Sequence, residues 1–599
     1  MKTILYISTF LLSVQTLFAQ ANYSKETLAK IKAVENGLAG RVKIEGQPDH
    51  SIEERMKQYK IKGLSIAVVH NYKVEWAKGY GWANEEEKKP VTTQTLFEPG
   101  SISKSLNAVG ILKLVQDKKL DLHTDINTYL TTWKFPYDSL SKNKKITLAQ
   151  LLSHSAGLTV HGFPGYDREA KIPTLPQVLD GKEPANSPPV RSEFEPGLKF
   201  QYSGGGTTIS QLLLTDVTKQ PYDVFMYENV LKPIGMGNSF YTQPPAKNKL
   251  ALCASGYYGN GTAVPNKFHV YPEQAAAGLW MTPTDLCHYI IETQLAYEGK
   301  SAKVLNKEMT RLRLTPYNDE NAALGVFVEK HNNTLYFQHG AGNEGFSGQY
   351  FGSLEGGNGV VIFANTDNNP FIFPEIINSV AAAYNWKDFY NPVYKKQVPV
   401  SENTLQAYPG IYLYDDTWAS VLKKDDGYYF YAAEIYAKMY FSSDSTFFNT
   451  EFLADKTFVT DAKGTITGYN RKVNSKVSPP ATKIINPDTL NLDKRQLNEI
   501  AWHLLENKRP TEAMRYLNRA LQFYPGDLLT LGNLAHSHLF SNNYKAAIDI
   551  YKAHATEAID EKFTWKDMIK QDFMFFKQHG FDTQEMNKVL MELDMAKMD

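Results

Sequence analysis

Cysteine is nearly absent from this chain, which has only Cys253 and Cys287 among its 599 residues. Two cysteines exclude a small scaffold held together by several disulfides. One bridge between them is conceivable, but Cys287 follows Thr282-Pro283, which predicts a helix with a threonine cap and proline at its first position. A buried free thiol on that helix is supported at least as well, so the pairing stays open.

The chain also lacks an excess of charge of either sign, with 64 Lys and Arg against 64 Asp and Glu. No basic stripe or arginine-rich run is present, which argues against a nucleic-acid partner. No spacing of His, Cys and Asp predicts a metal site, and we expect no cofactor. After the first residues no apolar run is long enough to cross a bilayer, so we expect no transmembrane segment.

The first residues have the pattern of a signal peptide, which we place at residues 1–21. Lys2 is followed by the apolar stretch Ile4–Phe18 and then by Ala19-Gln20-Ala21. A short positive region, an apolar segment too short to span a membrane and an A-x-A site are typical of export. We therefore predict an exported protein, periplasmic or secreted. The alternative is a buried N-terminal helix, and the lack of a cysteine after the apolar segment argues against a lipid anchor.

A chain of this length exceeds what a single core can hold, so several domains are expected. The first, residues 22–390, has two strands flanking the turn Asn71-Tyr72-Lys73, a mainly helical middle and a buried strand at 359–364. Strands at both ends of a helical middle predict an α+β domain whose sheet is completed by distant segments.

The remaining residues change their periodicity twice. Residues 391–401 lose periodicity and are predicted to form a linker. Residues 402–485 are strand-like, with turns at Asp425-Asp426-Gly427 and at Asp461–Gly464, and predict a small β-sandwich or barrel. Residues 486–599 are predicted to be all-α repeats.

These repeats have a period of 34 residues, at which small and apolar residues recur. The matching pairs are Ala501 and Ala535, Leu505 and Leu539, and Ala513 and Ala547. That spacing, with Pro525 closing the first unit, resembles tetratricopeptide repeats. Repeats of this kind bind a protein or peptide partner or act as a stabilising cap, and the sequence leaves both readings open.

The motif that carries chemistry is Ser101-Ile-Ser-Lys104, because residues three apart share one face of a helix and a lysine can then take the proton of a serine nucleophile. Ser-x-x-Lys occurs four times, but only Ser101 precedes an amphipathic helix. The apolar residues of that helix are Leu106, Val109, Leu112 and Val115. The other pairs are Ser139–Lys142, Ser141–Lys144 and Ser420–Lys423. Pro99-Gly100 predicts a turn that places Ser101 at the helix start, where its backbone N–H is free to stabilise an oxyanion.

Two further segments are candidates to meet Ser101. Tyr202 precedes Ser-Gly-Gly-Gly and a helix expected from about Thr207, and His339 lies at a strand end before Gly-Ala-Gly. Small residues let the backbone approach a ligand closely. Taken singly, each has an ordinary alternative, a packing tyrosine and a tight turn.

Together these segments resemble the penicillin-recognising serine hydrolases of the class C β-lactamase type, a family that includes D-alanyl carboxypeptidases, D-aminopeptidases and esterases. Gly-Ser-Ile-Ser-Lys at 100–104 is similar to its first motif, Tyr202-Ser-Gly204 to its second, and His339-Gly-Ala341 to its third. The resemblance covers residues from about 50 to 385. Further matching phrases are Gly63–Val69, Leu151–Leu158, Leu231–Met236 and Ala277–Asp285.

The resemblance implies an antiparallel sheet flanked by helices, with a helical subdomain. It also implies roles. Ser101 is the nucleophile, Lys104 the base and Tyr202 the group that passes protons, while His339 orients Tyr202 or the substrate. The N–H groups of Ser101 and Gly342 hold the oxyanion, and Gly204 and Ala341 contact the substrate.

The sequence departs from the family pattern at the second and third motifs. Gly204 stands where the family usually has a substrate-binding Asn. His339 replaces a lysine that helps to hold a substrate carboxylate, and Ala341 precedes Gly342 where the motif usually ends in Gly. A partly neutral histidine holds a carboxylate less strongly. We expect β-lactams to be poor substrates.

The expected activity is hydrolysis of small amides or esters through an acyl-enzyme, with D-amino-acid peptides, acyl esters and β-lactams as the substrate classes to consider. The alternative is a non-catalytic, penicillin-binding-like sensor or a peptide-binding protein that acts through its helical repeats. The retention of all three residues Ser101, Lys104 and Tyr202 favours the enzyme. The sequence does not predict the substrate itself, because specificity depends on loops such as 159–195, which contain no recognisable motif.

Overall fold

The computed structural model describes residues 23–598, except a few short internal stretches. Those stretches are 368–370, 415–416, 433–434, 474–475, 490–491 and 560–563. The predicted signal peptide therefore lies outside the described residues. The chain forms two compact units, the first containing residues up to 40 and 48–392, and the second containing 41–47 and the residues from 393 onward.

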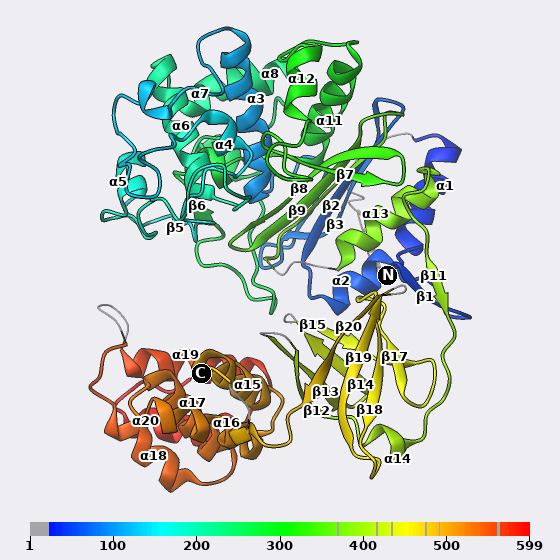
Figure 1. Ribbon diagram of the computed structural model, residues 1–599, viewed down its shortest axis with the longest axis vertical. Coiled ribbons are helices and arrows are strands. Elements are labelled where there is room, and N and C mark those ends of the chain that lie inside the picture. The colour runs from blue at the N-terminus through cyan, green and yellow to red at the C-terminus, as the bar shows by residue number, and fades with distance from the viewer. Residues whose placement is uncertain are drawn as a thin grey trace, which may run out of the picture. The chain divides into compact units, whose positions relative to one another are not determined.

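A seven-stranded antiparallel sheet forms the centre of the first unit, with the order β4-β3-β2-β10-β9-β8-β7 (Figure 1). Its strands are β2 (Gly63–His70), β3 (Lys73–Asn84), β4 (Lys89–Pro90), β7 (Phe327–His331), β8 (Thr334–Asn343), β9 (Phe346–Ser353) and β10 (Gly359–Ala364). Asn71 and Tyr72 both have positive φ, 51° and 59°, as a two-residue hairpin turn between β2 and β3 requires. Strand β10 pairs with β2, which confirms that distant segments complete the sheet.

Helices cover both faces of this sheet. One face packs against α1 (Lys25–Asn36), α2 (Ile52–Gln58) and α13 (Ile372–Ala383), and Arg55 of α2 forms a buried ion pair with Glu375 of α13. The other face packs against α11 (Pro283–Glu298), which begins with the predicted threonine cap and proline. Cys287 of this helix and Cys253 are both buried free thiols.

A mainly helical region, formed largely by residues between β4 and α11, contributes Ser101, Lys104 and Tyr202 of the candidate site. Its elements are η1 (Gly100–Ile102), α3 (Ser103–Gln116), η2 (Ile126–Thr128), α4 (Leu148–Leu152), β5 (Tyr166–Asp167), α5 (Leu175–Asp180), α6 (Gly204–Thr218), α7 (Tyr222–Met226), η3 (Tyr227–Leu231), α8 (Lys232–Ile234), α9 (Lys247–Leu250), β6 (His269–Val270), α10 (Gln274–Ala277) and α12 (Lys307–Arg313). Among the helices of the described residues, none combines the length and the apolar character needed to cross a membrane.

The second unit begins with a nearly closed, nine-stranded antiparallel barrel, of order β15-β14-β13-β12-β20-β19-β18-β17-β16. Its elements are α14 (Glu402–Leu405), β12 (Gly410–Tyr414), β13 (Thr417–Lys424), β14 (Gly427–Ala432), β15 (Ile435–Lys438), β16 (Tyr440–Phe441), β17 (Thr446–Phe448), β18 (Asp455–Thr460), β19 (Ile466–Val473) and β20 (Lys476–Lys483). Aromatic rings fill its interior, with Tyr408 and Phe458 stacked 3.8 Å apart. The predicted small β domain is thus a barrel.

The segment predicted to be a linker, residues 391–401, contains a strand. Strand β11 (Val393–Lys395) pairs in parallel with β1 (Val42–Ile44), so residues 41–47 belong to the second unit. The expectation of an irregular linker is wrong at these three residues, because a partner some 350 positions earlier in the sequence leaves no local periodicity to detect.

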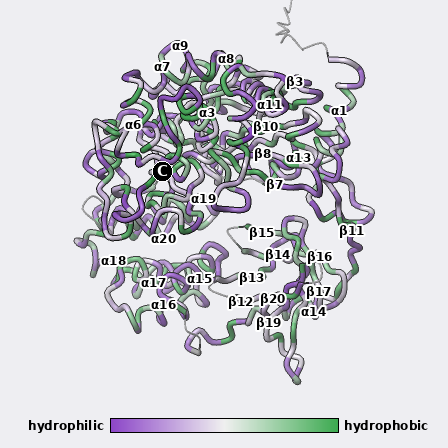
Figure 2. The backbone as a smooth tube through the Cα atoms, turned by 45° about the horizontal axis from the view of Figure 1, so that its top comes forward, coloured by the Kyte–Doolittle hydropathy of each residue, from purple (hydrophilic) through white to green (hydrophobic). Residues whose placement is uncertain are grey.

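The C-terminal helices follow a 34-residue offset, since α15 and α17 begin 34 residues apart, as do α16 and α18. The helices are α15 (Lys494–Glu506), α16 (Pro510–Phe523), α17 (Leu528–Phe540), α18 (Tyr544–Ala553), α19 (Trp565–Gln578) and α20 (Thr583–Glu592), preceded by η4 (Pro487–Thr489). Hydrophobic and hydrophilic residues alternate along them (Figure 2). The alanines and leucines of the predicted repeat are buried.

Candidate active site

Ser101 lies in the one-turn helix η1 that precedes α3, and it is partly exposed between buried neighbours. Gly100 has φ +53°, and a Cβ at this position would lie 2.5 Å from the carbonyl oxygen of Gly342. Both the backbone conformation and this close approach require glycine. The motif therefore places the Ser101 turn directly against strand β8.

Lys104 lies one helical turn after Ser101 and is only 4% exposed. Its Nζ donates a hydrogen bond to Ser101 Oγ at 2.9 Å and another to the carbonyl of Ala276 in α10 at 2.7 Å. The same nitrogen lies 5.0 Å from the centre of the Tyr202 ring. The sequence-predicted Ser101, Lys104 and Tyr202 are thus brought together.

Tyr202 precedes helix α6, which begins at Gly204 rather than near Thr207. The earlier start has a local cause. Ser203 is the N-cap, and its Oγ accepts the backbone N–H of Gly206 at 2.9 Å, which compensates for glycines in the first turn. The ring of Tyr202 lies 6.3 Å from that of His339.

His339 is 3% exposed in strand β8. Its Nδ1–H donates to the carbonyl of Gly340 at 2.5 Å, while Nε2 is buried without a hydrogen-bond partner in the described structure. Burial lowers the pKa of His339 to about 4, and the nearby Lys104 charge acts in the same direction. His339 is therefore a neutral imidazole at pH 7.

Strand β8 offers one uncovered edge beside Ser101. Strand β7 pairs with it only as far as Gln338, whereas β9 pairs with it as far as Asn343. The carbonyl of Gly342 points toward Gly100, and in an extended strand the N–H of the same residue projects to the same edge. A Cβ at Gly342 would meet no atom within 4 Å, so that side of the strand is open, and Ala341 is half-buried beside it.

His154 also lies at this site, although no role for it was predicted from the sequence. It has φ +56°, and its Nδ1 accepts the backbone N–H of Ser203 at 3.2 Å. Its ring lies 4.2 Å from that of Tyr202. Burial, reinforced by the Lys104 charge and His339, holds the pKa of His154 well below its usual value. A non-glycine residue with positive φ is the signal that marks it, and that signal appears only in the structure.

Two buried carboxyl groups also surround the site. Glu98 accepts a hydrogen bond from Gln243 Nε2 at 2.7 Å, and burial raises its pKa well above the usual value. Glu273, directly before α10, has its pKa raised to about 8 by burial. Burial therefore favours the neutral form of both carboxyl groups.

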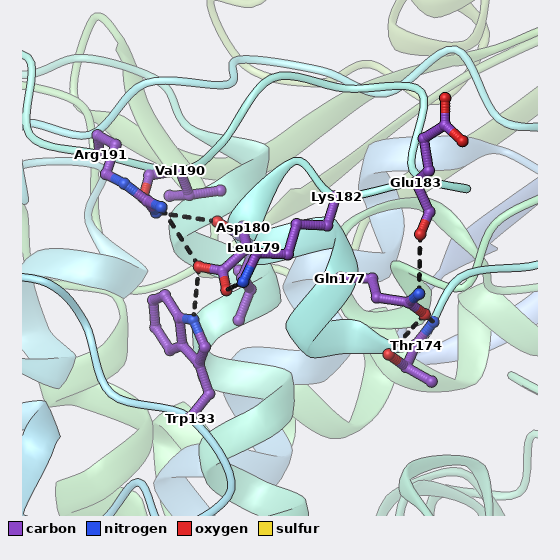
Figure 3. Close-up of polar contacts among 9 residues, drawn as sticks. All are labelled: Trp133, Thr174, Gln177, Leu179, Asp180, Lys182, Glu183, Val190 and Arg191. Atoms are coloured by element: carbon purple, nitrogen blue, oxygen red, sulfur yellow. Dashed lines mark hydrogen bonds and ion pairs between the residues drawn. The ribbon is translucent and has the colours of Figure 1, made fainter.

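Residues 159–195 form the loop whose sequence contains no recognisable motif. A polar cluster around Asp180 holds this loop in place (Figure 3). One carboxylate oxygen of Asp180 accepts the indole N–H of Trp133 at 3.1 Å and the guanidinium of Arg191 at 3.3 Å. The other accepts Lys182 Nζ at 3.0 Å. Asp180 therefore links the end of α5 to Trp133 and to the segment 182–191 that follows the helix.

Arg191 connects this cluster to the candidate site. Its backbone exchanges two hydrogen bonds with Thr159, one to Oγ1 at 2.9 Å and one from the Thr159 N–H at 3.0 Å. The carbonyl of Thr159 then accepts Ser203 Oγ at 2.8 Å. The loop is thus continuous, through hydrogen bonds, with the residue after Tyr202.

In the described part of the chain, no group of three or more His, Cys, Asp or Glu side chains is arranged to hold a metal ion. Ser101, Lys104, Tyr202 and His339 converge instead with the open edge of β8. A serine hydroxyl, a buried amine, a phenol and the open strand edge at Gly342 form a set suited to nucleophilic acyl transfer.

Comparisons with known proteins agree with this geometry. The model of the Beta-lactamase family matches residues 49–384, more than half of the chain. Protein flp from Staphylococcus aureus (strain N315) is 26% identical over 329 residues, which cover 54% of this chain and 63% of that protein. A Beta-lactamase from Pseudomonas fluorescens is 30% identical over 246 residues, or 40% of this chain and 62% of that protein.

The chain therefore matches less than two thirds of the length of these relatives. Among solved structures, the octameric penicillin-binding protein homologue from Pyrococcus abyssi is similar in fold, with a TM-score of 0.50, 20% identity and coverage of 72% of this chain and 97% of that one. The motifs, the fold and the family match lead to one conclusion: this chain belongs to the Beta-lactamase family of serine hydrolases and penicillin-binding protein homologues.

Proposed function

We propose that this protein is an exported serine hydrolase of the class C type that cleaves small esters and amides through an acyl-enzyme. The observation that carries the proposal is the 2.9 Å hydrogen bond from Lys104 Nζ to Ser101 Oγ. An amine in direct contact with a serine hydroxyl is placed to remove its proton during attack.

The proposed cycle has two steps. Ser101 Oγ attacks the substrate carbonyl as Lys104 takes its proton, and Tyr202 passes a proton to the leaving group. Water, activated by Tyr202, then cleaves the acyl-enzyme, and Lys104 returns its proton to Ser101 Oγ as the acid is released. The backbone N–H groups of Ser101 and Gly342 hold the oxyanion, supported by the approach of Gly342 to the Ser101 turn.

The substrates that fit best are short acyl esters and D-amino-acid amides. Gly204 has no side chain to hold a substrate amide, and the neutral, buried His339 supplies no positive charge for a carboxylate. We therefore expect penicillins and cephalosporins to be hydrolysed much more slowly than small esters.

The test is covalent labelling by a fluorophosphonate, followed by intact mass and by ester turnover. Wild type should gain one adduct and hydrolyse esters, whereas Ser101→Ala should do neither. Lys104→Arg keeps the positive charge but cannot release a proton near neutrality, so it should be nearly inactive. Rapid turnover by Ser101→Ala contradicts the proposal. Labelling with no turnover on any ester or amide favours the sensor instead.

The C-terminal helices and the export signal extend the proposal. The 34-residue offset between helix pairs supports tetratricopeptide-like repeats, which would bind a protein or peptide partner or stabilise the barrel. The pattern in residues 1–21 supports export to the periplasm or medium. N-terminal sequencing of the protein recovered from a periplasmic fraction should begin after Ala21. An intact Met1 there would contradict cleavage at this site.

A further inference from the structure

The segment Thr159–Phe163 runs beside the residues that follow Tyr202. His161 Nδ1–H donates to the Tyr202 carbonyl at 2.6 Å, and the His161 carbonyl accepts the N–H of Gly204 at 3.3 Å. The Val160 carbonyl accepts the next N–H, from Gly205, at 3.0 Å. These bonds fix the segment against the start of α6, where the polar N–H groups would otherwise be available to a ligand.

Phe163 occupies the space that a side chain at position 204 would need. A Cβ built on Gly204 lies 3.0 Å from Phe163 Cε2 and 3.4 Å from its Cδ2. Gly204 is an ordinary helical residue at the start of α6, so its backbone conformation does not itself demand glycine. The phenyl ring and the carbonyl oxygen of His161, 3.3 Å from the same Cβ, therefore crowd a side chain there, and the ring is the contact that a substitution can remove.

The ring is only partly buried, and it packs on the main apolar core of the first unit. The ring therefore has part of its surface packed on the core and part exposed, and its Cε2 edge faces Gly204, two residues from Tyr202. A phenyl ring neither donates nor accepts a conventional hydrogen bond, so a polar amide placed against it loses its water partners without replacement. An apolar chain placed there gains from leaving water.

We propose that Phe163 is a specificity-determining residue that gives the acyl site an apolar wall in place of an amide-binding side chain. The substrate class that fits this wall is an ester with an unbranched, apolar acyl chain of several carbons. This inference rests on the proposed function, because it concerns the acyl group transferred to Ser101.

The test uses the full chain and p-nitrophenyl esters from acetate to octanoate. A fully buried methylene is worth roughly fourfold in binding, so wild-type kcat/KM should rise by up to about 16-fold with each pair of carbons until the acyl chain extends beyond the Phe163 ring. In Phe163→Ala the loss should grow with acyl length, reaching about tenfold or more at hexanoate and entering mainly through KM. Phe163→Leu keeps an apolar side chain at this position and should retain most of the wild-type activity on long-chain esters. Leu198→Ala removes an apolar side chain that is 64% exposed, and it should match wild type.

A second experiment replaces the Phe163 ring by an amide side chain at position 204. Gly204→Asn alone must displace the ring and should lose long-chain ester activity. Combined with Phe163→Ala, the asparagine has room, and hydrolysis of D-alanine p-nitroanilide should exceed that of either single variant. An equal loss by Phe163→Ala on every ester, acetate included, would show a structural role alone and overturn the proposal. So would a double variant no better than the singles on the anilide.

Fluorophosphonate labelling separates failure of this inference from failure of the proposed function. If wild type is labelled and turns over esters but acyl preference is the same in Phe163→Ala, only the assignment of Phe163 fails. If wild type is neither labelled nor active, the hydrolase proposal fails, and the inference fails with it.

Discussion

Two imidazoles lie near the ring of Tyr202, that of His154 at 4.2 Å and that of His339 at 6.3 Å, and the Lys104 amine lies 5.0 Å from the same ring. Burial lowers the pKa of both. Removal from water disfavours the charged form of each imidazole, and the coulombic effect of Lys104 acts in the same direction. Both histidines therefore act as neutral rings that pack and hydrogen-bond beside Tyr202 without adding positive charge next to Lys104.

The depressed pKa of His339 makes stability depend on pH in a defined direction. Burial lowers this pKa from 6.5 in the unfolded chain to about 4 in the fold. Between those values the unfolded chain binds a proton that the folded chain does not, so the free energy of unfolding decreases as pH falls from 6.5 toward 4. Between pH 7.5 and 5, wild type should lose about 2 kcal/mol more than His339→Asn, at 1.36 kcal/mol per pH unit.

Urea unfolding at both pH values measures this difference. His123→Asn replaces an exposed histidine and should show the wild-type pH dependence. If His339→Asn loses stability with acid as steeply as wild type does, the folded imidazole is charged and the assignment of a neutral His339 is wrong.

We predict that His154 is a positioning residue, which holds Tyr202 in place by packing on its ring and by accepting the Ser203 N–H. Its backbone is left-handed, which Asn tolerates well, and an Asn side chain also offers an acceptor for the Ser203 N–H. We expect His154→Asn to keep activity within about fivefold, and His154→Ala to lower kcat by about 10²-fold with little change in KM, as a misplaced proton-transfer group would. Steady-state ester kinetics of the two variants decide this. A loss in KM alone would assign His154 to substrate binding instead.

Neither His154 nor Phe163 could be assigned from the sequence, and the reason is physical. Ser101 and Lys104 are three residues apart, so one helical turn is enough to predict their contact. His154 and Phe163 reach the Tyr202 segment from some 40 residues away, through a loop whose path depends on tertiary hydrogen bonds. Hydrophobic periodicity indicates which face of a helix or strand is buried, but it does not predict the path of a loop.

At the scale of elements, the strands and helices with a strong pattern were predictable. The hairpin around Asn71, the buried strand at 359–364 and the capped helix after Thr282 are present. The start of α6 was predicted three residues late, because three glycines disfavour a helix and the compensating Ser203 cap is judged correctly only once its bond to Gly206 is known. The pairing of β1 with β11 had no local signal at all.

The loop containing α5 should influence the site through its anchoring. Asp180→Asn keeps an acceptor for Trp133 but weakens the ion pair with Arg191, which is bonded to Thr159 and through it to Ser203. This partly exposed pair is worth about 1 kcal/mol at most, so we expect a three- to fivefold rise in KM with kcat nearly unchanged. Limited proteolysis should also cut the loop faster. Lys182→Ala, which removes the 72% exposed partner, is the matched control and should stay near wild type. A KM unchanged in Asp180→Asn contradicts this coupling.

At the scale of the whole molecule, chemistry and the C-terminal helices belong to different units. Every residue of the candidate site lies in the first unit, within 48–392. In the second unit, His503 of α15 is buried against the barrel, with Nε2 2.7 Å from Ser420 Oγ and its ring stacked 4.0 Å from Tyr431. The barrel and the helices are therefore coupled to each other through an aromatic and hydrogen-bonded contact.

A chain ending near Ile485 should separate these two roles. It lacks His503, so the Ser420 hydroxyl loses that hydrogen bond and Tyr431 loses one of its ring contacts, and the second unit should unfold at a lower temperature. Activity should remain, because Ser101, Lys104 and their neighbours keep all their contacts, and kcat/KM for a small ester should stay within about twofold of the full chain. Scanning calorimetry and ester kinetics on the same samples measure both effects.

Full-length His503→Ala removes the hydrogen bond to Ser420 and serves as the control for this truncation. It should lower the free energy of unfolding of the second unit by about 1–3 kcal/mol, with no loss of activity. Complete loss of hydrolysis in the shortened chain would mean that the helices help to build the catalytic site.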